Sequence, residues 1–217
     1  FYLVFREAEP ERIIKRLHDL GVLANIHPAL EHSSWLADRY AALRAALPQW
    51  RAWGWGNGGR GGDEPTALTA AYVALLTYRL PAAAFLDVRT RLNLSGTIGA
   101  IVEQARELQE RVPELACAPA PSRVYRLLQP YMVEAIVVVA IGEEDPPVRQ
   151  AIASYMQTLR HVRTEIDGNL LRQLAVPPGP VYHRVLQAVL DARLDGKVAS
   201  RAEEERLART LLAATLD

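Results

Sequence analysis

The chain has 217 residues, half of them hydrophobic, which is enough to bury one sizeable core or two small ones. Its 25 Lys and Arg residues balance 25 Asp and Glu residues, which excludes an overall attraction for a polyanion, so any nucleic-acid contact must come from a local patch. The single Cys117 excludes an intrachain disulfide, and no apolar run has the length of a membrane span or a signal peptide, so we expect a cytoplasmic protein with no membrane partner.

The first part of the chain predicts two helices. Pro10 opens the first and Gly21 ends it, because proline suits the first turn of a helix and glycine the position after the last. The second is predicted over residues 34–47, with Pro48 as its stop. Residues 48–65 are then rich in Trp and Gly and predict a mobile loop between segments.

That loop contains a G-x-G-x-x-G pattern from Gly54 to Gly59. A dinucleotide-binding loop follows a strand and opens a helix, and neither flanks this pattern, so we reject that interpretation. The tryptophans Trp50, Trp53 and Trp55 either stack on RNA bases or anchor the loop on the core, and we favour anchoring.

Residues 65–112 predict three further helices, which begin at Pro65, after the break at Pro81, and after the capping residue Ser95. Residues 113–121 hold three prolines and predict a linker.

Residues 132–141 favour a strand by local propensity, because the run from Ile136 to Val139 is β-branched. No other strand lies near in sequence to pair with it, so we predict a fully buried helix instead. Asp145 caps the next helix and Pro146 takes its first position.

Basic residues recur on the helices of the second half. Ser122 is predicted to cap a helix that carries Arg123 and Arg126, for which phosphate contact and a solvated face are both open. A second group of basic residues lies on a later helix and at its end, and two more arginines follow further along the chain. Together they predict one basic patch across three helices, made of Arg149, Arg160, His161, Arg163, Arg172 and Arg184.

Residues 168–196 predict a helical hairpin. Two prolines stop a short helix, Gly179 permits the turn, and Pro180 begins a long amphipathic helix with His183 and Arg184 in its first turn. The unpaired N–H groups and the positive dipole end of such a terminus bind phosphate, although an ordinary helix–helix turn has the same pattern. The candidate RNA-binding residues are therefore Arg123, Arg126, Arg160, Arg163, Arg172, Gly179, Pro180, His183 and Arg184.

Three segments in order along the chain carry a resemblance. They run from Arg16 to Leu30, from Pro121 to Leu128 with Glu134-Ala135 after it, and from Leu174 to Leu186 with Ala192 to Val198 after it. They resemble segments of the bacterial class II tRNA nucleotidyltransferases, which are the CCA-adding and A-adding enzymes of the poly(A) polymerase family.

The resemblance implies the C-terminal part of such an enzyme, with the end of its neck, its body and its tail. The family's catalytic head carries a Gly-Ser signature and a pair of metal-binding aspartates, and we find neither here. We therefore expect a fragment that lies downstream of the head. Mg²⁺ and ATP or CTP are implied for the missing head and no cofactor for this chain, while the implied partner is tRNA, held by its sugar–phosphate backbone.

We therefore predict an all-α fold, an elongated array of about nine to eleven helices. Its segments would be a neck-like end over residues 1–47, the Trp/Gly-rich loop over 48–65, body-like helices over 66–115 and a tail-like region over 116–217.

Neither a catalytic nor a metal site is predicted, so we expect no transferase activity from this chain alone. The serines lack a partnered His-Asp pattern, and the dipeptide His18-Asp19 lacks further ligands at helical spacing. Two alternatives to tRNA binding stay open. One is a helical interaction module that forms a homodimer, and the other is a helix–hairpin–helix type DNA binder, because the turn over residues 177–180 has that general design.

Overall fold

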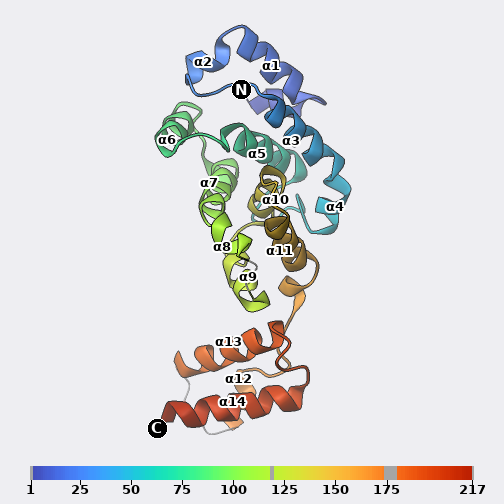
Figure 1. The fold of residues 1–217 in the computed structure, drawn as a ribbon, viewed down its shortest axis with the longest axis vertical. Helices are drawn as coiled ribbons and strands as arrows, with labels where there is room; N and C mark the ends of the chain where they lie inside the picture. The colour runs from blue at the N-terminus through green and yellow to red at the C-terminus, as the bar shows by residue number, and fades with distance from the viewer. Residues whose placement is uncertain (1, 118–119, 174–179, 217) are drawn as a thin grey trace. The chain divides into compact units, whose positions relative to one another are not determined.

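The computed structural model describes residues 2–117, 120–173 and 180–216, and this part of the chain is all-α, as predicted (Figure 1). It forms fourteen α-helices and two 3₁₀ helices, and ten of the α-helices have seven or more residues. Within the same residues there is no strand, only an isolated bridge between Asn57 and Asp63.

The chain divides into two compact units. Unit 1 consists of residues 1–116 and 131–149, and unit 2 of residues 117–130 and 150–217. The expected elongated array and the four predicted segments are not tested by this division and stay predictions.

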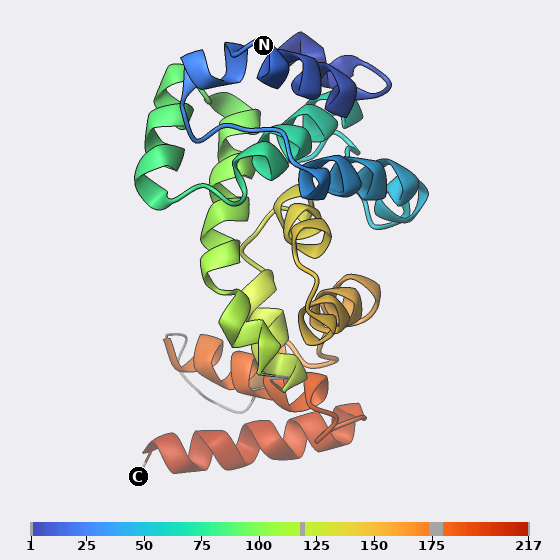
Figure 2. The same ribbon diagram turned by 45° about the horizontal axis from the view of Figure 1, so that its top comes forward.

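Unit 1 packs around helix α5 (Glu64–Thr77), in which ten of the fourteen residues are buried. A helix that is apolar on all sides belongs inside a core. Helices α7 (Gly96–Glu110) and α10 (Val133–Gly142) pack against it (Figure 2). The other helices of unit 1 are η1 (Tyr2–Arg6), α1 (Pro10–Asp19), α2 (Val22–Ile26), α3 (Ser34–Ala45), α4 (Leu47–Ala52), α6 (Ala82–Arg91) and α8 (Val112–Ala116).

Helix α10 confirms the prediction of a buried helix in place of a strand. Eight of its ten residues are buried, among them the β-branched run from Ile136 to Val139. Burial on every side allows these side chains to pack without a partner strand, so tertiary contacts override the local propensity.

Unit 2 contains α9 (Pro121–Leu128), η2 (Leu159–His161), α12 (Gly168–Gln173), α13 (Pro180–Leu194) and α14 (Arg201–Leu216). Helix α11 (Pro146–Gln157) begins in unit 1 and continues into unit 2. Helices α13 and α14 pack side by side, and α9 also packs on α13. A core shared by α12, α13, α14 and the segment before α12 comprises Ile166, Leu170, Leu171, Val185, Val189, Ala208 and Leu212.

Two predictions about proline need correction. The helix predicted over residues 34–47 ends at Ala45, and Pro48, predicted as its stop, lies in the first turn of the next helix, α4. Pro113, predicted to lie in a linker, is in the first turn of the short helix α8. A proline in the first turn loses no hydrogen bond, because the N–H at that position has no partner within the helix. Proline alone therefore does not distinguish the end of one helix from the start of the next.

The start of α9 also differs from the prediction. Ala120, not Ser122, precedes the first helical residue, and Ser122 is buried inside the first turn. Its backbone N–H donates to Oδ1 of Asp195 at 2.9 Å, so a residue that follows α13 satisfies the start of α9. A capping oxygen distant in sequence replaces the local one that we expected.

The Trp/Gly-rich segment is more ordered than a plain loop. Its first residues belong to α4, and Trp50 and Trp55 are 6% and 2% exposed. The interpretation of these two tryptophans as anchors is confirmed, and they are not available to stack on RNA bases.

Candidate nucleic-acid interface

Helix α13 begins at Pro180, as predicted, and its first turn contains no acidic residue. The first N–H groups of a helix lack partners within it, and the helix dipole adds positive potential there. His183 and Arg184, the fourth and fifth residues of the helix, are exposed. Gly179 lies outside the described residues, so the predicted role of the turn stays a prediction.

Three predicted residues offer side chains that are open to a ligand. Arg172 at the end of α12, His183 and Arg184 are exposed, and none bonds to a described residue. A guanidinium in this state presents its fork of N–H donors to solvent, which suits it to bind a phosphate in a bidentate manner.

Arg160 lies in the 3₁₀ helix η2 and Arg163 just after it, and both bond only to uncharged groups. Arg163 Nη1 donates to the carbonyl oxygens of Arg160 and Val162, both at 2.8 Å. Arg160 Nε lies 3.1 Å from Nε2 of His161. These contacts orient the guanidinium groups but leave their positive charge uncompensated by any carboxylate among the described residues.

The two predicted arginines of α9 differ from this group. Arg126 pairs with Asp191 of α13 at 2.6 Å, and the other oxygen of Asp191 accepts from Gln187 at 3.2 Å. The charge of Arg126 is therefore balanced, and the pair joins α9 to α13. Arg123 is exposed on the same helix.

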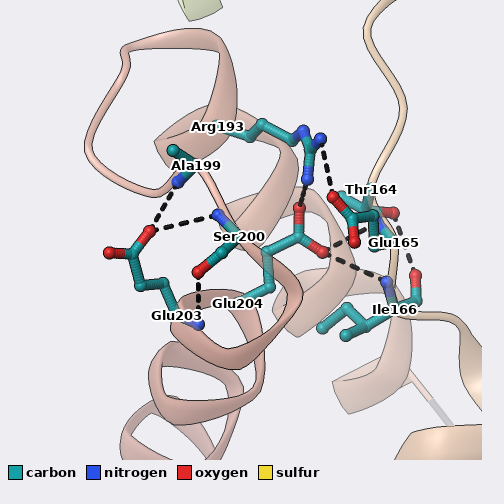
Figure 3. A network of polar contacts seen from close by, with 8 residues as sticks. All are labelled: Thr164, Glu165, Ile166, Arg193, Ala199, Ser200, Glu203 and Glu204. Carbon is teal, nitrogen blue, oxygen red and sulfur yellow. Dashed lines mark hydrogen bonds and ion pairs between the residues drawn. The ribbon is translucent and has the colours of Figure 1, made fainter.

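A polar network that the sequence did not suggest holds the backbone before α12 (Figure 3). The Glu204 side chain is 0% exposed, and its Oε2 accepts from the N–H groups of Glu165 at 2.7 Å and Ile166 at 3.1 Å. Arg193 bonds to Glu204 and, at 3.0 Å, to the carboxylate of Glu165. Helices α13 and α14 thus fix the segment that immediately follows Arg163.

The capping box at the start of α14 is confirmed and lies beside this network (Figure 3). Glu203 accepts from the N–H groups of Ala199 at 2.7 Å and Ser200 at 3.1 Å, and its own N–H donates to Oγ of Ser200 at 3.4 Å. The backbone bonds from Ala199 and Ser200 lower the pKa of Glu203. The adjacent glutamates therefore have different roles: Glu203 caps the start of α14, and Glu204 bonds to backbone N–H groups in the interior of unit 2.

Charge is distributed unequally between the units. Unit 2 has eleven Lys and Arg against eight Asp and Glu, a formal net charge of +3. Unit 1 has fourteen against seventeen, a formal net charge of −3. The net charge of zero for the whole chain is thus the sum of an acidic unit 1 and a basic unit 2. All the predicted RNA-binding residues belong to unit 2.

The described part of the chain places no three His, Cys, Asp or Glu side chains where they could hold a metal ion. No single helix in the same residues is long and apolar enough to span a membrane; α9 and α10 meet that test only when joined across the break between them.

No family model matches the chain. In sequence it is 29% identical over 213 residues to the A-adding tRNA nucleotidyltransferase of Geobacter sulfurreducens. The aligned region covers 95% of this chain and 23% of that protein. In structure it is similar to a CCA-adding enzyme in an apo form, with a TM-score of 0.68 and 18% identity over 98% of this chain and 48% of the other.

A Thermotoga maritima CCA-adding enzyme complexed with tRNA gives a TM-score of 0.65 and 18% identity, over 97% of this chain and 49% of the other. The chain thus spans about a quarter of the A-adding relative and about half of the CCA-adding ones. In sequence the chain is thus similar to one region of an A-adding tRNA nucleotidyltransferase, and in fold to one region of CCA-adding enzymes, which is the resemblance that its three ordered segments predicted.

Proposed function

We propose that unit 2 binds the sugar–phosphate backbone of a tRNA. The observation that carries the proposal is the set of arginines on and before α12 and α13 whose charge no described carboxylate balances. The relatives support the choice of ligand, since one is an A-adding tRNA nucleotidyltransferase and another was solved with tRNA.

The chemistry suits positioning and not sequence reading. Arginine forks bind phosphate oxygens whatever the attached base, and folded RNA is recognised largely through its shape and backbone. Arg172 and Arg184 would contact phosphates directly, while Arg160 and Arg163, oriented by their neighbours, would contribute further positive charge. The basic residues would thus set the position of the RNA and leave its sequence unread.

Nucleotide transfer belongs, in this proposal, to a part of the parent enzyme outside this sequence. Mg²⁺ and ATP or CTP would act there, and the present chain would bind tRNA without extending it. Whether the parent adds C and A or only A depends on that other part.

Filter binding with tRNA over a series of salt concentrations tests the proposal. The double variant Arg172→Ala/Arg184→Ala should lower the slope of log K against log salt by about 2, since each lost phosphate contact removes about one unit. The control Arg201→Ala/Arg206→Ala removes the same charge from α14, where both arginines pair with glutamates of that helix, and should leave the slope unchanged.

Wild-type binding that is absent or independent of salt would refute the proposal, as would an equal loss in the control variant. Two further measurements address the other functions considered. If duplex DNA competes more strongly than tRNA, the chain is a DNA binder. If it does not bind tRNA and light scattering shows the molecular mass rising to twice the monomer value at higher protein concentration, it is a dimerisation module.

A further inference from the structure

The Trp/Gly-rich segment has a part that the proposed function does not use. We define the glycine loop as residues 53–63, between α4 and α5. At its centre is the sequence Gly58-Gly59-Arg60-Gly61-Gly62, in which one arginine stands among four glycines.

The loop is closed at its base by several bonds. Asn57 and Asp63 form the isolated bridge, and the N–H of Gly58 donates to the carbonyl of Gly62 at 3.1 Å. Just outside the loop, Arg51 makes two bonds to Glu64, at 2.7 and 2.6 Å. Both ends of the loop are therefore tied to each other and to the helices that flank it.

A buried carboxylate lies under the loop. Glu134 of α10 is 4% exposed, and its Oε1 accepts from the N–H of Gly56 at 3.2 Å. A Cβ atom at Gly61 would lie 2.0 Å from the carboxyl carbon of Glu134, so a larger residue here would force the Glu134 carboxyl group to move. A buried carboxylate is costly unless it accepts hydrogen bonds, so Glu134 requires the N–H of Gly56 to stay in place. The loop conformation is therefore constrained by Glu134 as well as by the two flanking helices.

Among the Lys and Arg residues of unit 1, Arg60 is the one that has no hydrogen bond, ion pair, ring contact or other electrostatic partner among the described residues. Eight of the fourteen Lys and Arg side chains of this unit pair with a carboxylate. Arg91 and Arg149 donate to backbone carbonyls, and Arg79 lies over the ring of Trp35. The side chains of Arg6 and Arg16 make no hydrogen bond or ion pair among the described residues, but the charge of each makes a small contribution to lowering the pKa of Asp63 and of Asp19, respectively. Arg60 is exposed and bonds to nothing described.

We infer that Arg60 binds a phosphate of the RNA backbone and gives unit 1 an anion contact of its own; this inference rests on the proposed function. The neighbouring glycines have no side chains, so a bulky sugar–phosphate chain can approach the guanidinium closely. The anchored loop also limits the freedom that Arg60 loses on binding. A phosphate accepts both N–H groups of the guanidinium fork, which makes it the matching ligand.

The test uses the full chain and tRNA in the same filter-binding series. Arg60→Ala should weaken binding about tenfold at low salt, the effect of losing one charge-assisted contact, and lower the salt slope by about 1. Arg60→Lys, which keeps the charge, should keep most of the slope. The control Arg12→Ala removes an exposed arginine of unit 1 that pairs with Glu9 at 3.1 Å, and should bind like the wild type.

The thermal midpoint of Arg60→Ala should equal that of the wild type, because the side chain bonds to no described group. If Arg60 instead serves to balance Glu134, the variant will melt earlier and bind tRNA with an unchanged slope, which overturns the inference. A salt-dependent wild type with an unaffected Arg60→Ala variant refutes the role of Arg60 alone. A wild type that does not bind tRNA removes the proposed function and this inference together.

Discussion

The substitution Glu204→Ala tests the network that holds the backbone before α12. It removes a carboxylate that is fully buried, that accepts two backbone N–H groups and that bonds to Arg193. The N–H groups of Glu165 and Ile166 would be left without acceptors, and a small void would replace the side chain. The substitution should therefore destabilise unit 2 specifically.

The magnitude follows from the contacts that are lost. A hydrogen bond to a charged group contributes about 1.5–3 kcal/mol, and breaking one side of a buried ion pair costs about 3–5 kcal/mol. Arg193 keeps its bond to Glu165 and is 23% exposed, so its charge is not left fully uncompensated. We expect Glu204→Ala to cost about 3–4 kcal/mol, and Glu204→Gln, which keeps an acceptor oxygen, about 1–2 kcal/mol.

Two spectroscopic probes separate the units in a urea titration. All four tryptophans, Trp35, Trp50, Trp53 and Trp55, belong to unit 1, so their fluorescence reports on that unit. Far-ultraviolet circular dichroism reports on the helices of both. Glu204→Ala should add an early step to the dichroism curve and leave the fluorescence midpoint in place.

Glu205→Ala is the matched control, because it removes the neighbouring glutamate, which pairs with Arg201 at 3.0 Å on the surface of α14. An i,i+4 pair of this kind contributes only about 0.3–0.5 kcal/mol. The reasoning is wrong if both glutamate variants shift the curve equally, or if fluorescence and dichroism move together.

Three further substitutions test other parts of the fold. Gly61→Ala should destabilise unit 1 by about 1–3 kcal/mol, measured by tryptophan fluorescence in urea, because the new Cβ overlaps the Glu134 carboxyl group. Asp195→Ala should cost about 1–2 kcal/mol, measured by dichroism, because it removes the oxygen that accepts from the N–H of Ser122. Burial raises the pKa of Tyr155 from 10.0 to about 12, so the folded state holds its proton longer, and stability present below pH 10 should fall as the pH rises toward 12. Tyr155→Phe should remove that part of the alkaline loss in unfolding titrations.

The helix starts were predictable where the signal is local. Pro10, Pro146 and Pro180 each occupy a first turn, and the Ser200–Glu203 capping box forms as expected. Pro48 misled, because the same residue type suits the start of a new helix as well as the stop of an old one. Only the chain that follows, with its contacts, decides between the two.

The supporting network was not predictable from local patterns. Glu204 stands between two other glutamates, and such a run is typical of a solvated helix start. Its partners, the backbone N–H groups of Glu165 and Ile166, lie 39 and 38 residues away. Glu203 does behave as the run suggests, so one position along a helix separates a capping residue from a fully buried one. Which of the two glutamates is buried depends on which side of α14 faces the core, and the sequence alone does not show that side.

The overall charge gave the least guidance, for a physical reason. A net charge of zero excludes long-range attraction only if charges of both signs are mixed throughout, and here they are separated into a unit of −3 and a unit of +3. At physiological salt the Debye length is about 8 Å, so a phosphate responds to the charges around it and not to the total. Carboxylates balance most cations of unit 1. In unit 2, by contrast, Arg160, Arg163, Arg172 and Arg184 have no such partner among the described residues. Binding of a polyanion therefore depends on which arginines are left unbalanced, and counting pairs in each unit is the more informative use of composition.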